Sequence, residues 1–221
     1  MSERFETSGY EAKDDGYFGG VRRDFLALLP AGGDARVLEI GCGSGETGAA
    51  ALADGLAASY HGVEIAPRAA ALARTRLTEV IEGNVESLDL PWTERHFDAV
   101  LMSEVLEHLV DPWTVVERVA ALLKPGALVV ASSPNVAQIA IVRGLLAGRW
   151  DLTETGVMDR THLRWFTRAS YCRMFEDAGI HVDRIRDLSV PGARTKLFNL
   201  LTFGRLRHLT TRQICIVGRK R

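Results

Sequence analysis

The sequence has little cysteine, no long apolar run and no apolar segment near its start. Its three cysteines, Cys42, Cys172 and Cys215, are too few and too scattered for a disulfide framework or a zinc knuckle. No apolar run approaches the roughly 20 residues that span a bilayer, and residues 1–20 lack the apolar core of a secretory signal. These absences exclude secreted scaffolds and membrane-spanning chains, so we expect a cytoplasmic protein, with the inner face of the membrane as a second location.

The charge is balanced overall but unevenly distributed along the chain. The 221 residues carry a net charge of −1 and are 47% hydrophobic, which is typical of one globular domain with a sizeable core. Residues 189–221 contain eight Lys or Arg and no Asp or Glu, so residues 1–188 have a net charge of −9. A basic end on an acidic body indicates either an anionic partner or a solvated surface, and the acidic body argues against nucleic acid.

Apolar strand-like segments alternate with helix-like segments along most of the chain. This order predicts an α/β fold with a doubly wound, mostly parallel sheet covered by helices on both faces. The seven expected strands are 36–40, 60–65, 80–83, 97–102, 127–132, 180–188 and 213–218. Residues 1–221 then form a single domain, in which 136–166 and 189–211 are insertions on the substrate side.

A glycine-rich loop, 39–45, follows the first expected strand and precedes a helix. Glycines there allow a ligand to approach the backbone closely, at the N-terminus of the helix. The spacing Gly43-x-Gly45-x-x-Gly48, with Glu64 about 20 residues on, also matches the dinucleotide fingerprint. Glu39 at the mouth of the loop argues against that alternative, because a carboxylate repels a pyrophosphate and attracts a cationic ligand.

The loop and four later blocks together resemble the Class I S-adenosylmethionine-dependent methyltransferases. The blocks are VLEIGCGSG, GVEI, EGNVESLDLP, FDAVLMSEVLEHLVDP and LKPGALVVASSPN, in family order over residues 35–135. The resemblance implies a seven-stranded Rossmann-like sheet and a cofactor-binding core at 31–135, and we expect the preceding segment 1–30 to cover the cofactor. It also implies S-adenosylmethionine as cofactor, held by Glu39, Gly41, Gly43, Gly45, Glu64, Ile65, Asn84, Val85 and Ser103.

Two carboxylates and a histidine follow the fourth expected strand. Glu104, Glu107 and His108 have i, i+3, i+4 spacing, so on a helical turn they would share one face. Such a face can bind a divalent cation through oxygen and nitrogen ligands, or form a local arrangement of ion pairs.

A later histidine extends this cluster by resemblance. The E-x-x-E-H block, with His162 ahead of an aromatic-Thr-Arg helix start, resembles metal-dependent 2′-O-methyltransferases of small RNA 3′ ends. The block alone also resembles the ubiquinone-pathway O-methyltransferases. The resemblance implies that Glu104, Glu107, His108 and His162 bind Mg²⁺ or Mn²⁺. The alternative is catalysis by His108 and His162 without a metal, since histidine exchanges protons near neutral pH.

The class of methyl acceptor is inferred from the segment 133–167. This segment resembles bacterial methyltransferases of surface-polysaccharide and glycan assembly. The first expectation is therefore O-methylation of a sugar or glycan hydroxyl by direct displacement. The alternatives are a quinone, phenol or other small molecule, and a cofactor-binding regulatory subunit without activity of its own. RNA methylation is disfavoured because the chain has no added RNA-binding domain.

Two terminal segments complete the expectations. The stretch Tyr10–Phe18 has the aromatic residues and glycine to fold over the cofactor. Residues 194–209 combine apolar and basic side chains, which suggests a weak peripheral contact with a membrane. The sequence does not assign an oligomeric state.

Overall fold

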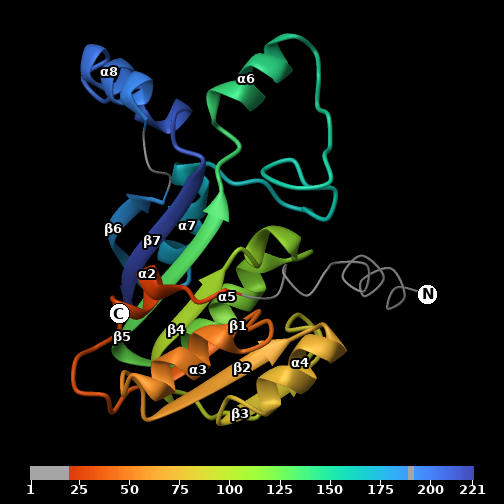
Figure 1. Ribbon diagram of the computed structural model, residues 1–221, viewed down its shortest axis with the longest axis vertical. Coiled ribbons are helices and arrows are strands. Elements are labelled where there is room, and N and C mark those ends of the chain that lie inside the picture. Colours follow the sequence, from red (N-terminus) through yellow and green to blue (C-terminus); the bar gives the residue numbers. More distant parts are fainter. Residues whose placement is uncertain (1–19, 189–191) are drawn as a thin grey trace.

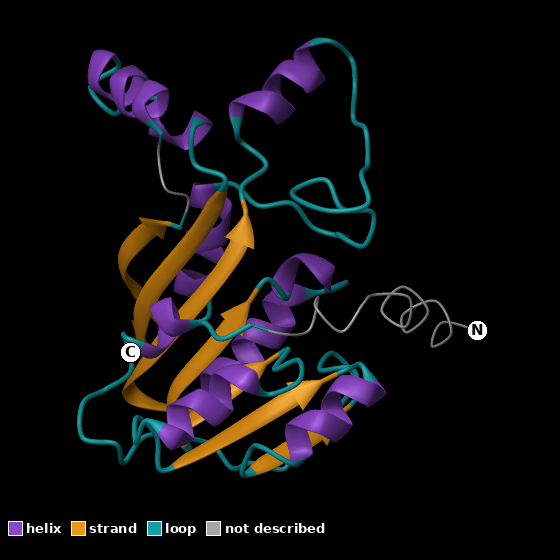
Figure 2. Ribbon diagram, viewed as in Figure 1, coloured by secondary structure: helices purple, strands orange, loops and turns teal. Residues whose placement is uncertain are grey.

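The computed structural model describes residues 20–188 and 192–221, which form one seven-stranded sheet with helices on both faces (Figures 1 and 2). The strand order is β3-β2-β1-β4-β5-β7-β6, and β7 runs antiparallel to both of its neighbours. The expected α/β fold with a mostly parallel seven-stranded sheet is confirmed. The strands are β1 Arg36–Ile40, β2 Ser59–Glu64, β3 Glu79–Glu82, β4 Phe97–Ser103, β5 Leu123–Pro134, β6 Ile180–Asp187 and β7 Gln213–Lys220.

Strand β5 is longer than the sequence pattern indicates. Leu123 already pairs with Phe97 of β4, and regular pairing resumes at Leu128 opposite Ala99 after a register shift. The shift accommodates Lys124-Pro125-Gly126, in which Gly126 has a φ of 81°. A glycine in that conformation lets the strand bulge and continue, whereas the expected strand began only at residue 127.

The helices begin where the local chemistry favours it. Pro67 occupies the first turn of its helix, the Asp111 side chain accepts a hydrogen bond from the Thr114 N–H, and Thr167 and Ser170 form a reciprocal capping box. The helices are α2 Arg23–Leu26, α3 Glu46–Ala53, α4 Pro67–Arg74, α5 Pro112–Ala121, α6 Ile139–Leu146, α7 Arg168–Asp177 and α8 Ala193–Leu201, with the 3₁₀ turns η2 Leu106–His108 and η3 Arg207–Leu209.

Side chains that alternate along each strand form two apolar cores, one on each face of the sheet. Leu38 and Val100 pack with α5 and α7 on one face, whereas Val37 and Leu101 pack with α2, α3 and α4 on the other. Since both faces are covered, polar groups that bind a ligand are left at the edge where the parallel strands end. The order reverses direction at β1 and β4, which is where such sheets place their ligands.

Of the two expected insertions, the described residues 136–166 and 192–211 extend beyond the carboxyl end of β5 and the start of β7 (Figure 1). Asn135 is fully buried at the point where both leave the sheet. Its side-chain Nδ2 donates to the carbonyls of His208 and Thr211, each at 2.8 Å, and its Oδ1 accepts from Ala137 N–H at 3.1 Å. One side chain therefore joins the bases of both projecting segments.

We expect Asn135→Ala to lower the free energy of unfolding by about 2–3 kcal/mol, because it leaves buried carbonyl groups without donors. Urea unfolding followed by circular dichroism measures this. Asn199→Ala is the matched control: the side-chain oxygen of half-buried Asn199 accepts one bond, from Thr210 Oγ1 at 3.2 Å, and its loss should cost less than about 1 kcal/mol. Equal effects of the two variants would contradict the anchoring role of Asn135.

None of the helices in the described ranges is long and apolar enough to cross a membrane.

Candidate active site

The glycine loop between β1 and α3 lies against the end of β2. The backbone N–H groups of Gly41 and Cys42 donate to the Val63 carbonyl at 2.8 and 3.2 Å. Gly41, Gly43 and Gly45 have φ values of 71°, 53° and 79°, which side chains rarely adopt. The loop therefore turns tightly enough to leave the backbone exposed to a ligand at the N-terminus of α3.

Glu64, the last residue of β2, is held by the backbone of this loop. Its Oε2 accepts from Gly43 N–H at 2.8 Å and its Oε1 accepts from Ala66 N–H at 2.9 Å. Burial raises the pKa of this carboxyl, and the backbone hydrogen bonds oppose the rise. Because a carboxylate has about four acceptor positions, Glu64 retains capacity for hydroxyl donors of a ligand.

Glu39, near the end of β1, is a buried carboxyl in the same corner. Its Oε2 accepts from the Tyr60 hydroxyl at 2.9 Å, and only 4% of the residue is exposed. Burial raises the pKa of Glu39 to about 8, while Tyr60 and the positive charge of Arg22 act in the opposite direction. A carboxyl in this state gains much from a cationic ligand, which would restore its charged form.

Arg22 enters the same corner from the segment before α2 and was not predicted. Its guanidinium donates to Ser103 Oγ at the end of β4, binds both oxygens of Asp24 at 2.9 Å, and lies 3.8 Å from the centre of the Phe25 ring. Nothing in the sequence separates Arg22 from Arg23, because the Ser103 contact joins residues 81 positions apart. The segment Tyr10–Phe18 lies outside the described residues.

The remaining expected cofactor residues follow β2 and β3 at the same edge. Ile65 is half-buried and Val85 is buried. The Asn84 Oδ1 accepts from Glu86 N–H at 2.9 Å, so this side chain shapes the turn after β3. The nine expected residues therefore gather along the carboxyl ends of β1 to β4.

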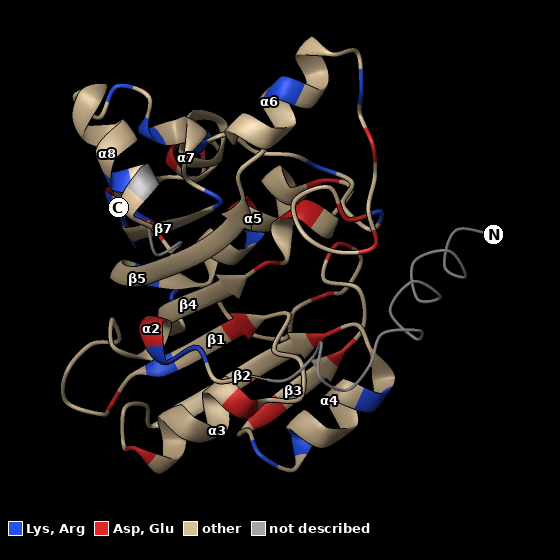
Figure 3. Ribbon diagram, turned by 45° about the horizontal axis from the view of Figure 1, so that its top comes forward, with Lys and Arg blue, Asp and Glu red and all other residues tan. Residues whose placement is uncertain are grey.

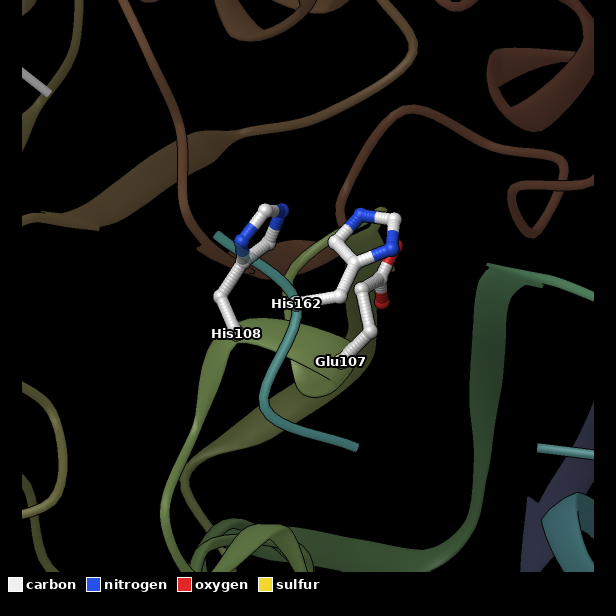
Figure 4. A group of neighbouring side chains, drawn as sticks. All are labelled: Glu107, His108 and His162. Carbon is white, nitrogen blue, oxygen red and sulfur yellow. The ribbon is translucent and has the colours of Figure 1, made fainter. Parts of the chain in front are cut away.

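A second cluster lies just after β4, where Glu107, His108 and His162 each offer one ligand atom within 4.8 Å of the others (Figure 4). The two imidazole rings are 4.7 Å apart between centres. Glu107 is buried, and within the described ranges neither oxygen of its carboxylate has a hydrogen-bond partner. Such an unsatisfied buried carboxylate is rare and calls for a cation, a proton or water.

Backbone contacts bring His162 to this cluster from 54 residues away in the sequence. The Glu107 carbonyl accepts from the N–H groups of Leu163 and Arg164 at 2.8 and 2.9 Å. The Nδ1 atoms of His108 and His162 lie 3.1 and 3.0 Å from the carbonyls of Thr161 and Val157. An imidazole that donates from Nδ1 carries its lone pair on Nε2, the form that binds a metal or accepts a proton.

Glu104 does not belong to this group, which corrects the expected helical face. Only Leu106–His108 is helical, and as a 3₁₀ turn. Glu104 has a φ of 54°, and its N–H donates to the Ser132 carbonyl at 3.1 Å. The backbone thus changes direction between Glu104 and Glu107, and the expected helical turn from Glu104 to His108 does not form.

The electrostatics of the cluster suit a cation. Burial, and next the charge of Glu104, raise the pKa of Glu107 well above its usual range. One unsatisfied carboxylate and two imidazoles form a nitrogen and oxygen donor set that Mg²⁺ or Mn²⁺ accepts, with manganese the better match for nitrogen. The residues present therefore fit a divalent ion.

Relatives in sequence are named O-methyltransferases. A ubiquinone biosynthesis O-methyltransferase of Xanthomonas campestris pv. campestris (strain B100) is 35% identical over 120 residues, 52% of this chain and 49% of the relative. The enzyme of the same name from Thiobacillus denitrificans is 28% identical over 172 residues, 75% of this chain and 72% of the relative. The chain thus spans about half the length of the Xanthomonas relative.

Solved structures share the fold. A SAM-dependent methyltransferase from Archaeoglobus fulgidus has a TM-score of 0.66 at 18% identity, covering 90% of each chain. An S-adenosylmethionine-dependent methyltransferase from Mesorhizobium loti has a TM-score of 0.65 at 19% identity, covering 91% of this chain and 99% of its own. The family model described as Methyltransferase domain matches residues 15–185, which is most of the sequence. The chain therefore belongs to the methyltransferase domain family.

Proposed function

We propose that this protein transfers the methyl group of S-adenosylmethionine to a hydroxyl oxygen of a small-molecule acceptor. The observation that carries the proposal is the position of two sites along the same sheet edge. The Glu39–Glu64 corner suits a cationic nucleoside, and the Glu107–His108–His162 cluster suits activation of a hydroxyl.

The cofactor corner matches the chemistry of S-adenosylmethionine group by group. Glu39 would pair with the ammonium, Glu64 would accept the ribose hydroxyls, and the glycine loop would admit the methionine end. Ile65, Val85 and Asn84 would contact the adenine. Arg22 and Ser103 already contact each other at this edge, and we assign them to the carboxylate, because a guanidinium binds carboxylates in a fixed geometry.

We expect cofactor affinity to depend on pH through Glu39. Below its pKa of about 8 the free carboxyl is protonated, and it must release a proton to pair with an ammonium, so protons oppose binding. Affinity for S-adenosylhomocysteine should therefore rise between pH 6 and 8, by at most about tenfold per pH unit. It should fall above roughly pH 8, where an α-amino group itself loses its proton.

Calorimetry in buffers of different ionisation enthalpy measures the released proton. Glu39→Gln should bind more weakly and lose the rise below pH 8, whereas Glu117→Gln, an exposed control on α5, should keep it. An unchanged pH profile in Glu39→Gln would place the ammonium elsewhere.

Methyl transfer from a sulfonium needs alignment and a deprotonated acceptor more than it needs a covalent intermediate. Without a metal, His108 and His162 would orient the acceptor hydroxyl, and one of them would take its proton at Nε2. Glu107, His108 and His162 would hold a divalent ion, which when bound supplies a positive charge that lowers the pKa of the acceptor hydroxyl. The metal-free alternative uses the same two histidines, with Glu107 acting on their orientation and charge.

For the acceptor, the relatives favour a phenolic or quinone-derived hydroxyl over the expected sugar hydroxyl. Two of them are named ubiquinone biosynthesis O-methyltransferases, and none of the reported relatives supports a glycan. The segment that supplies His162 continues to Trp165, which packs edge to face with Trp150 at 5.1 Å between ring centres. Aromatic side chains this close along the chain to His162 are compatible with an aromatic acceptor.

The test is turnover by the purified full chain with S-adenosylmethionine, a catechol or a hexuronic acid glycoside, and Mn²⁺ or chelator. We expect S-adenosylhomocysteine to form with the catechol. Turnover with the glycoside and none with the catechol would favour a sugar hydroxyl as the acceptor. Cofactor binding with no turnover on either acceptor would contradict the proposed activity and favour a regulatory subunit.

A further inference from the structure

Two projecting segments form one end of the molecule, beyond the carboxyl end of β5 (Figure 1). The first is α6 with the loop to Trp150, and the second runs from α8 through η3. We call residues 136–150 and 192–211 together the terminal surface. Both are rooted at Asn135 through its bonds to Ala137, His208 and Thr211, so they leave the sheet at a common point.

Large apolar side chains of the terminal surface face outward. Leu146 is 84% exposed, Leu200 72%, Leu201 70% and Phe203 84%. No described side chain of α6 or α8 is buried. The other exposed apolar residues here are Ile139, Leu145, Trp150, Leu197, Phe198 and Leu206.

The exposed apolar side chains of α8 lie on one face of the helix. Leu197, Leu200 and Leu201 have i, i+3, i+4 spacing and so share one face of α8. Helices of eight or nine residues gain little stability by themselves, and most helices are stabilised by burying an apolar face. A group of large apolar side chains that are exposed together on a protein surface is typical of an interaction site.

The charge of the terminal surface is of one sign. Residues 136–150 and 192–211 contain six Lys or Arg and no Asp or Glu. Taking these from the net charge of −1 leaves −7 on the rest of the chain. Figure 3 shows blue and no red on α6 and α8, whereas red gathers at the carboxyl ends of β1 and β2. In the described ranges no carboxylate forms an ion pair with Arg143, Lys196, Arg205 or Arg207.

The exposed apolar side chains and the positive charge together indicate which partner the terminal surface binds. A second copy in a two-fold interface would bring basic residues against basic residues, which costs free energy. An anionic bilayer satisfies both features, because apolar side chains enter the headgroup boundary while Lys and Arg bind lipid phosphates. We propose that the terminal surface, formed by α6 and α8, docks this protein onto an anionic lipid bilayer.

Docking would also place the proposed active site near the lipid. The loop that follows α6 reaches His162 sixteen residues after Leu146, so one continuous segment connects the terminal surface with the cluster. In a consequence that rests on the proposed function, an apolar aromatic acceptor would reach the site from the bilayer. The docking itself depends on neither cofactor nor acceptor.

The experiment is co-sedimentation of the purified full chain with vesicles of equal parts phosphatidylglycerol and phosphatidylcholine. We expect binding that weakens with added salt and is much weaker with phosphatidylcholine alone. The double variant Leu200→Glu/Leu201→Glu should lower the partition coefficient at least about tenfold, since two apolar contacts are replaced by repelled charges. The control is Leu72→Glu on α4, an exposed leucine outside the terminal surface, which should bind like the original protein.

Three results would overturn the proposal. They are absence of binding to anionic vesicles, equal loss in Leu72→Glu and in the double variant, and sedimentation velocity showing a dimer that the double variant dissociates. Turnover is measured separately with a water-soluble catechol. A failure of the proposed activity therefore leaves the vesicle result intact, and the reverse also holds.

Discussion

Replacing His162 by alanine is expected to lower the rate of methyl transfer at saturating cofactor by about 10²–10⁴-fold, the usual contribution of a positioned acid–base group. His162 is buried beside Glu107 and His108, within 4.8 Å between ligand atoms. It has no contact with the glycine loop among those described, so affinity for S-adenosylhomocysteine should stay unchanged. Initial-rate kinetics with a catechol acceptor and calorimetry measure the two quantities.

The control is His208→Ala, because His208 is exposed on the far projecting segment. It should retain full activity. Equal rates in His162→Ala and His208→Ala would remove His162 from the mechanism. A parallel titration with Mn²⁺ distinguishes the metal-assisted mechanism from the metal-free one. If the cluster holds the ion, the original protein should bind Mn²⁺ and Glu107→Ala should not. If the histidines act alone, neither protein should bind Mn²⁺.

Gly48→Ala is expected to lower the free energy of unfolding by about 3 kcal/mol and the melting temperature by roughly 10 °C. A Cβ atom on Gly48 would lie 2.4 Å from Tyr60 Cδ1 and 2.4 Å from Leu77 Cδ2. Tyr60 is fully buried and donates to Glu39, so it has little room to move. Cofactor affinity should fall as well, because displacing Tyr60 disturbs the carboxyl that would hold the ammonium.

Gly144→Ala is the matched control, with the same substitution inside a helix. Its Cβ would meet only the Arg149 carbonyl, at an ordinary 3.5 Å, and alanine favours a helix over glycine by up to about 1 kcal/mol. The two variants should therefore shift the melting temperature in opposite directions, as measured by circular dichroism. Destabilisation of the same size in both would show that helix propensity, and not the contact with Tyr60, governs Gly48.

The same glycine explains why the sequence also matched a dinucleotide fingerprint. Gly43, Gly45 and Gly48 have the fingerprint's spacing, but Gly48 is required by the packing of α3 on β2 and not by a ligand. That packing is common to both kinds of fold. The discriminating residue was Glu39, whose buried carboxyl disfavours a pyrophosphate, and the family match agrees with that choice.

The local features of the chain were predictable from the sequence because they depend on neighbouring residues. Apolar periodicity, the glycine turn and the capping residues Asp111 and Thr167 specified the sheet, its loop and two helix starts. The carboxylate–histidine cluster was half predictable. Its residues were named, but the expected helical alignment of Glu104 was wrong because the backbone reaches a left-handed conformation there.

What required the tertiary structure is contact between distant residues and the exposure of apolar ones. Arg22 reaches Ser103, and Asn135 ties two insertions together, through hydrogen bonds between residues more than 70 positions apart. Leu145, Leu200 and Leu201 have the same pattern as buried helical residues, and only packing shows that nothing in the described chain covers them. A sequence specifies which side chains are apolar, whereas the arrangement of all elements decides which of them are left facing outward.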